Sequence, residues 1–170
     1  QATLKVVGAF LGLSRERSDQ RRFPAIHPLD SWSKYEGIID VKKVAEARHI
    51  LAAGVDVNNM MKVVGEEGTS IDDFVIYLKS EYLDSVYLQQ DAYHEIDAAC
   101  SAERQKYVFD KVYTIRKTPM KFTEKDIARS FFLKLTQATK DWNRVKFDSQ
   151  EFKDLEASIF ASVKEVSANA

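Results

Sequence analysis

The chain has 170 residues, of which 45% are hydrophobic and 30% charged, and its formal net charge is −1. This composition is typical of a globular protein with one domain, or one domain plus part of another. Because positive charge is not in excess, nucleic acid and anionic membrane surfaces are excluded as primary partners.

Two further features limit the class of protein. The longest unbroken apolar run, from Val6 to Leu13, is too short to span a bilayer and lacks the flanks of a signal peptide, so we expect no direct membrane insertion. The single cysteine, Cys100, rules out an internal disulfide and fits a reducing compartment.

Residues 1–35 are interpreted as a strand followed by a loop. A lone strand over residues 1–13 cannot bury both faces or satisfy its edges. We therefore expect either that it belongs to a longer polypeptide or that it pairs with nothing locally and is poorly ordered. The charged run at residues 14–22 is interpreted as a solvated connector.

The segment at residues 21–35, RRFPAIHPLDSWSKY, gathers aromatic residues and two prolines in one irregular stretch. It is either a packed loop that starts a helical domain or a platform for a flat ligand. A second aromatic break, YLQQDAYHE, lies at residues 87–95. Rings at the spacing of Tyr87 and Tyr93 are typical of a core. Alternatively, the two breaks meet and form a slot in which rings stack on a purine and an amide reads its edge.

From residue 36 onward the pattern is helical. Asp40, Asp56, Ser70 and Asp148 are suitable N-caps, and Gly54 is a suitable helix end. Apolar residues at helical spacing predict helices over residues 41–53, 57–64, 71–90, 102–117, 124–145 and 150–166. The predicted fold class is mainly α, a bundle of about six helices preceded by a short strand-and-loop segment.

No familiar catalytic motif is present. The phosphate-binding pattern G-x-x-x-x-G-K-[ST], the dinucleotide pattern G-x-G-x-x-G, a nucleophile elbow and a zinc signature are all missing from the 170 residues. The best metal candidate is His94, Glu95, Asp97 and Cys100. We interpret this stretch as a helix junction with a buried thiol, and we expect no metal site.

Taken together, the two aromatic segments resemble a known family. RRFPAIHPLDSWSKY is similar to HFPAINWLxSYSxY of the catalytic A subunit of V-type and archaeal A-type ATPases. YLQQDAYHEIDAAC, residues 87–100, is similar to FLQQNAFHEVDxYC of the same subunit. The strand before the first motif and the helical patterns after each motif also fit, so the resemblance covers most of the chain.

The resemblance implies an adenine pocket at these two motifs. Phe23 would stack on one face of the base, and Pro24 would keep the preceding backbone extended. Ala92 and Tyr93 would close the other side, and Gln90 would line the edge. The F-type ATP synthase beta subunit is a distant relative of this family. By resemblance to it, the turn at residues 64–73 would face the rotating central stalk through four acidic residues: Glu66, Glu67, Asp72 and Asp73. The alternative for each of these is a solvated acidic turn.

The resemblance also implies the setting. Residues 1–35 would end a nucleotide-binding domain, and residues 36–170 would form the C-terminal helical domain. The full subunit would bind ATP or ADP with Mg and couple ATP hydrolysis or synthesis to proton or sodium transport. It would work in an alternating A3B3 hexamer whose B subunit supplies an arginine, at the cytoplasmic, peripheral head of a membrane-bound complex.

By the same resemblance, the fragment would contain no catalytic residue and would be inactive alone, because the phosphate-binding loop lies upstream. The residues also leave open a free-standing helical interaction module with no nucleotide role.

Overall fold

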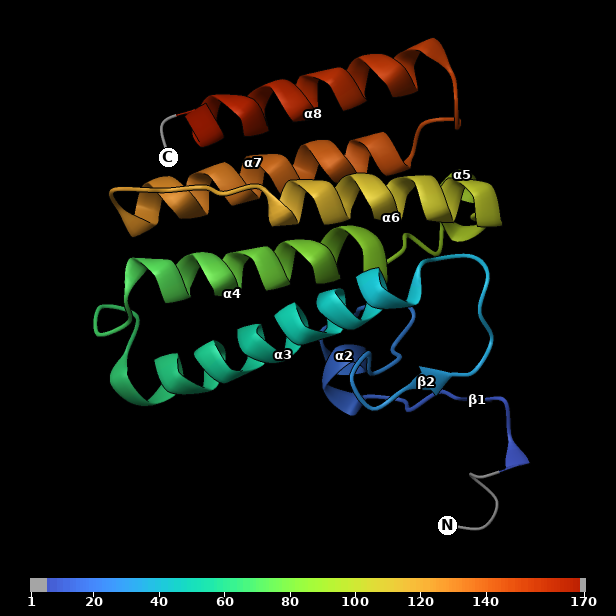
Figure 1. Ribbon diagram of the computed structural model, residues 1–170, viewed down its shortest axis with the longest axis horizontal. Helices are drawn as coiled ribbons and strands as arrows, with labels where there is room; N and C mark the ends of the chain where they lie inside the picture. Colours follow the sequence, from blue (N-terminus) through green and yellow to red (C-terminus); the bar gives the residue numbers. More distant parts are fainter. Residues whose placement is uncertain (1–5, 169–170) are drawn as a thin grey trace.

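The computed structural model describes residues 6–168 and is built mainly from helices (Figure 1), which confirms the mainly-α prediction. In chain order the elements are β1 (Ala9–Phe10), α2 (Arg15–Asp19), β2 (Trp32–Ser33), α3 (Val41–Val64), α4 (Ile71–Leu83), the π-helix η1 (Asp84–Leu88), α5 (Glu95–Ala98), α6 (Ala102–Lys117), α7 (Lys125–Asn143) and α8 (Gln150–Ala168).

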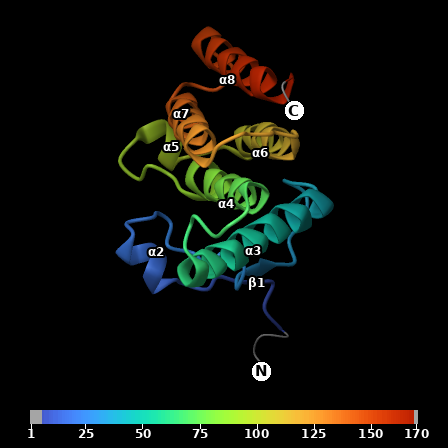
Figure 2. The same cartoon turned by 90° about the vertical axis from the view of Figure 1, so that its left-hand side faces the viewer.

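The long helices form a stack in which α4 is central. Figures 1 and 2 show α3 beside the N-terminal segment, then α4, then α6 and α7, with α8 outermost. Helix α4 contacts α3, α6 and α7, and its inward face supplies much of the core. The largest fully buried side chains include Phe74, Tyr82, Ile115, Trp142 and Phe152. Burial of such large apolar surfaces is the main stabilising contribution to this bundle.

The N-terminal segment pairs with itself. Strand β1 runs antiparallel to β2, with Phe10 opposite Trp32, and an isolated bridge joins Leu13 to Ile26. The predicted strand began at residue 1, and its first five residues lie outside the described part of the chain. For the described part, the expectation of no local pairing is wrong, because the partner is the loop that follows.

The predicted break at Gly54 is absent, and α3 runs through it. Gly54 is buried, and a Cβ built on it would lie 2.2 Å from the Cβ of Ser80 on α4. The glycine therefore serves the close approach of two helices, not the end of one. Asp56, expected to cap a separate helix, is exposed within the same continuous helix.

The predicted helix over residues 71–90 changes its winding and ends early. Helix α4 stops at Leu83, and η1 continues to Leu88 with a π-type bond from Gln89 N to Asp84 O of 3.0 Å. The side-chain amide of Asn143 donates to Val86 O at 2.7 Å and so satisfies a carbonyl of this turn. π-Turns of this kind are frequent at functional sites.

The other predicted helix boundaries are close to those observed. Asp40 and Ser70 cap α3 and α4 as expected. At α8 the cap is Ser149 and not Asp148, since the Ser149 hydroxyl accepts from Phe152 N at 3.2 Å. Asp148 has a φ of 61° and pairs with a nearby lysine, so it belongs to the preceding turn.

The charged run at residues 14–22 is not a solvated connector. It contains α2, and Arg17 is only 8% exposed, with Nη1 donating to Asp84 Oδ1 at 2.6 Å. Arg22 pairs with the other oxygen of Asp84 and with Glu81 Oε2, the latter at 3.1 Å. Burial lowers the pKa of Arg17, but arginine stays charged at any physiological pH. Two arginines thus attach the N-terminal segment to the bundle.

The loop at residues 21–35 is packed against α3. The guanidinium of Arg48 donates to Pro28 O and Leu29 O at 2.6 Å each and to Ser31 O at 2.8 Å. One side chain therefore satisfies three carbonyls that lie outside the short strand β2.

The close approach of Gly54 to Ser80 predicts that Gly54→Ala has the opposite effect on stability from Gly→Ala in an ordinary helix. In an ordinary helix interior, Gly→Ala stabilises by about 0.5–1 kcal/mol. We expect Gly54→Ala to destabilise by about 1–3 kcal/mol in urea unfolding of this chain, because the added methyl overlaps Ser80. Asn59→Ala, an exposed position on the same helix, is the control and changes stability by less than about 0.5 kcal/mol. Adding Ser80→Gly to Gly54→Ala removes the opposing Cβ and recovers part of the loss. A stabilised Gly54→Ala protein would contradict the packing argument.

Candidate functional site

The two aromatic segments meet in the fold. The backbone N–H of Gln90 donates to Phe23 O at 2.7 Å, which joins the first motif to the second although the two residues are far apart in the sequence. Phe23, Gln90, Ala92 and Tyr93 line one cavity of about 260 Å³. Four of the five residues assigned to a flat-ligand slot are therefore neighbours.

The rings of this cavity are not core residues. Phe23 is 49% exposed, and Tyr93 is fully exposed. Tyr87, by contrast, packs edge-on against Phe109 with ring centroids 5.1 Å apart, so it is the core residue of the second motif. Large apolar groups left open beside a cavity indicate a surface that is covered by a ligand or a partner.

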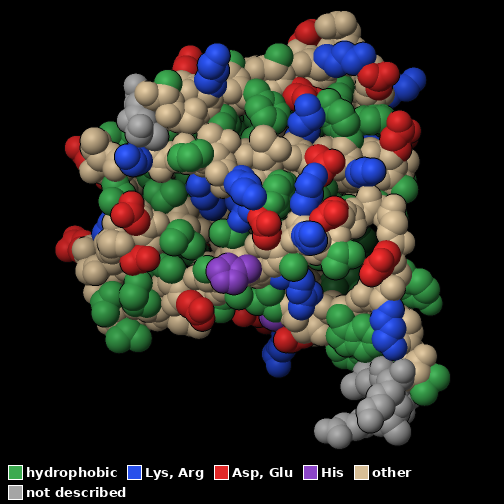
Figure 3. Space-filling model, in the orientation of Figure 1, with side chains coloured by type: hydrophobic (Ala, Val, Ile, Leu, Met, Phe, Trp, Pro, Cys, Tyr) green, Lys and Arg blue, Asp and Glu red, His purple; other side chains and the backbone are tan. Residues whose placement is uncertain are grey.

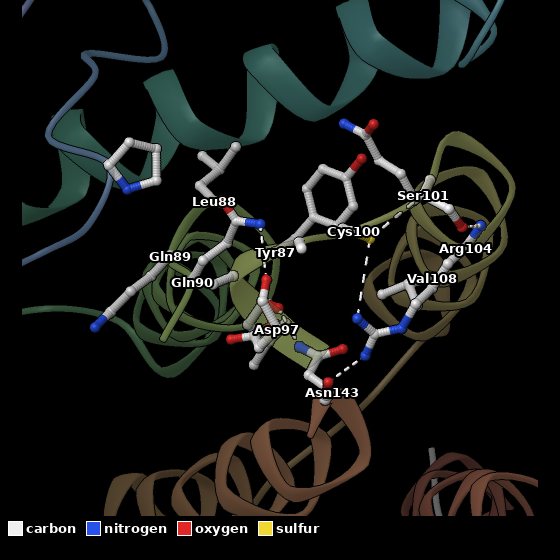
Figure 4. Close-up of a pocket in the computed structure, with 15 residues that line it drawn as sticks. Tyr87, Leu88, Gln89, Gln90, Asp97, Cys100, Ser101, Arg104, Val108 and Asn143 are labelled. Atoms are coloured by element: carbon white, nitrogen blue, oxygen red, sulfur yellow. Dashed lines mark hydrogen bonds between the residues drawn. The ribbon is translucent and has the colours of Figure 1, made fainter. Parts of the chain in front are cut away.

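Pro24 lies outside this cavity. It follows a cis peptide bond from Phe23 and lines a larger neighbouring cavity of about 710 Å³, which Gln90 also borders. Figure 4 shows this larger cavity between η1, α5 and α6, with the Gln90 side-chain amide bonded to Asp97 O at 3.0 Å. Gln90 thus separates the two spaces, and its amide donor is engaged by α5.

Charged residues that the sequence analysis did not assign also line the smaller cavity. Lys140 and Arg144 come from the last turn and the C-cap of α7, and Arg21 is the first residue of the first motif. Arg144 Nη2 pairs with Asp91 Oδ2 at 2.9 Å. The pKa of Asp91 is lowered, first by the backbone N–H of Tyr93 and further by this arginine.

No local pattern in the sequence could have found Lys140 and Arg144. Basic residues in the last turn of a helix are common because they complement its dipole. Only the return of α7 past η1 brings them to the aromatic segments.

The larger cavity contains a buried arginine. Arg104 is 5% exposed and donates from Nη1 to Ile96 O at 3.1 Å and from Nη2 to Asn143 O. The Cys100 sulfur lies 4.0 Å from Nη1 (Figure 4). The stretch 94–100 is the expected helix junction, with α5 inside it and Cys100 partly buried. Within residues 6–168, no group of three acidic, histidine or cysteine residues could hold a metal ion.

The four acidic residues of the turn between α3 and α4 differ in their contacts. Glu66 pairs with Arg129, and Lys125 Nζ donates to Glu66 O at 2.5 Å, which ties the turn to the start of α7. Asp73 accepts from the Ser70 hydroxyl at 2.7 Å as part of the cap of α4. Two of the four residues assigned to a stalk contact are therefore occupied within the chain. The side chains of the other two, Glu67 and Asp72, are exposed.

The surface carries mixed charge. On the face shown in Figure 3, acidic and basic side chains alternate among apolar ones. No helix within the described residues is long and apolar enough to cross a membrane.

Comparison with known proteins identifies the family. The family model for the C-terminal domain of V and A type ATP synthase matches residues 41–129, more than half of the chain. The V-type ATP synthase alpha chain of Borreliella burgdorferi is 59% identical over 159 residues, and that of Borrelia garinii subsp. bavariensis is 58% identical. The corresponding chain of Borrelia duttonii is 55% identical. Each alignment covers 94% of this chain and 28% of the relative, so the chain spans little more than a quarter of the length of the curated relatives it matches.

The resemblance drawn from the two aromatic segments is thereby confirmed. With a matching family model over residues 41–129 and relatives above half identity along nearly its whole length, the chain belongs to the family of C-terminal domains of V- and A-type ATP synthases.

Proposed function

We propose that this chain is the C-terminal part of a catalytic alpha chain of a V/A-type ATP synthase, in which it supplies one side of an adenine pocket. Residues 1–35 end the nucleotide-binding domain, and residues 36–170 form the helical domain. The whole subunit hydrolyses or makes ATP, with Mg, and couples this reaction to proton or sodium transport across a membrane.

The observation that carries the proposal is the hydrogen bond from Gln90 N to Phe23 O, beside a cavity that both aromatic motifs line. It brings a half-exposed phenyl ring and an exposed tyrosine to one opening, which the small Ala92 also lines. A purine presents two flat, polarisable faces and a polar edge, which such an opening fits.

The chemistry of phosphoryl transfer falls to residues outside this chain. The phosphate-binding pattern is absent from the 170 residues, so the chain binds and orients the base while other residues hold Mg and the phosphates. Three basic residues line the opening, Lys140, Arg144 and Arg21, against two acidic ones, Asp91 and Asp97. The small excess of positive charge favours an anionic ligand over a neutral one.

The setting of the proposed subunit follows the family. An alternating A3B3 hexamer places a B-subunit arginine at the phosphates, where it stabilises charge in the transition state. The hexamer is the cytoplasmic, peripheral head of the complex. The turn between α3 and α4 contacts the central stalk, chiefly through Glu67 and Asp72, whose side chains are exposed.

Loss of either ring weakens nucleotide binding in the complete subunit. Base–aromatic stacking contributes about 1–3 kcal/mol, so Phe23→Ala and Tyr93→Ala each weaken ATP binding about ten-fold in titration calorimetry. Val63→Ala, an exposed apolar residue at the far end of α3, is the matched control and leaves binding unchanged. If neither ring matters, the cavity is not an adenine pocket, and the helical interaction module is the better function.

Residues 1–170 alone bind ATP weakly. Without phosphate contacts the base is held by little more than stacking, so the dissociation constant is above about 1 mM. Calorimetry of this chain and of a chain extended upstream through a G-x-x-x-x-G-K-[ST] motif separates the two contributions. Micromolar binding by residues 1–170, or a complete reading frame without that motif, contradicts the proposal.

Neutralising the free carboxylates of the turn weakens stalk binding. Glu67→Gln combined with Asp72→Asn lowers the affinity for purified central-stalk subunits about two- to five-fold at low salt, and the difference shrinks as salt is raised. Asp154→Asn, on the exposed face of α8, is the control. Equal affinities for the double variant and the parent at low salt show that the turn does not contact the stalk through charge.

A further inference from the structure

We propose that Asp84 is a positioning residue of the nucleotide site, holding the Phe23 ring against the loop at residues 89–93. This inference rests on the proposed function, since it concerns the same opening. Asp84 does not line that opening and acts through Arg22, the residue directly before Phe23.

The side chain of Asp84 fixes the backbone next to Phe23, whose ring forms the first wall of the opening. Its carboxylate is 12% exposed and is shared by two arginines, Arg17 at 2.6 Å and Arg22 on the other oxygen. Arg22 also reaches Glu81, one turn back on α4. A guanidinium that bridges two carboxylates on one helix has little freedom to move, so the backbone that leads into Phe23 is fixed at this point.

The backbone of the N-terminal segment is folded so that both arginines reach the same acid. Helix α2 ends at Asp19, and Arg21, two residues later, has a φ of 57°. Arg21 N is bonded to Ser18 O at 2.9 Å, and Arg22 N is bonded to Arg17 O at 2.8 Å. This is a Schellman motif with a non-glycine residue in the left-handed position. The reversal places Arg22 beside Arg17 instead of beyond it.

The backbone of Asp84 fixes the start of the loop at residues 89–93, which forms the second wall of the opening. Asp84 begins η1, and its carbonyl accepts from Gln89 N at 3.0 Å, where the loop at 89–93 starts. The next residue, Gln90, donates its N–H to Phe23 O at 2.7 Å. The contacts therefore form a closed ring from the Asp84 carboxylate to Arg22 and Phe23, across to Gln90, and back to the Asp84 carbonyl.

This closed set of contacts gives a reason for a charged side chain, that of Asp84, inside this part of the bundle. A buried carboxylate is costly unless it is fully paired, and an apolar side chain would fill the same space at lower cost. An apolar residue at position 84 would still start the π-turn, but it would leave the segment before Phe23 without a fixed point.

The test measures how much of the affinity for ATP comes from the adenine base. It uses the complete subunit assembled with its partners. ATP and inorganic tripolyphosphate are titrated separately, because only ATP uses the aromatic walls. Asp84→Asn is expected to weaken ATP binding about ten-fold, as removal of the Phe23 side chain does. It is expected to leave tripolyphosphate binding unchanged. In a Phe23→Ala background, Asp84→Asn has no further effect on ATP, because the wall that it positions is already gone.

Two further variants keep the test decisive. Arg22→Lys retains the charge but cannot bridge Asp84 and Glu81, and it is expected to weaken ATP binding about three-fold without affecting tripolyphosphate. It replaces Asp84→Asn if that variant does not fold. Asp19→Asn removes an exposed aspartate that pairs with Arg15 on the same segment, and it leaves both affinities unchanged.

The outcomes separate this inference from the proposed function. If Phe23→Ala weakens ATP binding but Asp84→Asn and Arg22→Lys do not, or if they weaken ATP and tripolyphosphate equally, Asp84 is structural and the positioning role is wrong. If Phe23→Ala itself has no effect, the proposed function fails first. Selective loss of ATP affinity in all three variants supports both.

Discussion

The carboxylate of Asp84 is the constraint on which the rest of this structure depends. A buried negative charge must be paired, and no basic side chain of the bundle pairs with it in the described part of the chain. The partners are Arg17 and Arg22 of the N-terminal segment, whose regular structure is limited to the short helix α2, a two-residue ladder and one bridge. Pairing therefore attaches a segment that could not fold alone to the end of the central helix.

The same helix carries the other critical contacts. Gly54 lets α3 approach α4 at Ser80, and the Tyr82 hydroxyl meets Thr139 of α7 at 3.0 Å in a buried contact. Burial raises the pKa of this tyrosine. The N-terminus of α4 lies at the acidic turn, and its C-terminal end lies at Asp84. Helix α4 therefore lies between the proposed stalk contact and the proposed adenine opening, and its packing is a physical route by which the two could be coupled.

The sequence predicted what local chemistry determines. Helices α6, α7 and α8 follow from apolar spacing and caps, and the meeting of two aromatic motifs followed from a family resemblance. The failures share a cause, which is that the deciding partner is distant in sequence. Whether Gly54 ends a helix depends on Ser80, and whether Arg17 is solvated depends on Asp84, 67 residues away. The π-turn depends on a carbonyl that Asn143 of α7 satisfies.

The sequence also could not show which acidic residues of the turn between α3 and α4 have partners within the chain. The fold shows this. All four acidic residues looked equivalent in sequence, yet Arg129 and Lys125 occupy Glu66, and the cap of α4 occupies Asp73. The contacts of Glu66 join the turn to α7, and the contact of Asp73 belongs to the cap of α4. A partner that bound Glu67 and Asp72 would therefore act on a turn joined to two helices, one of which, α4, leads to Asp84.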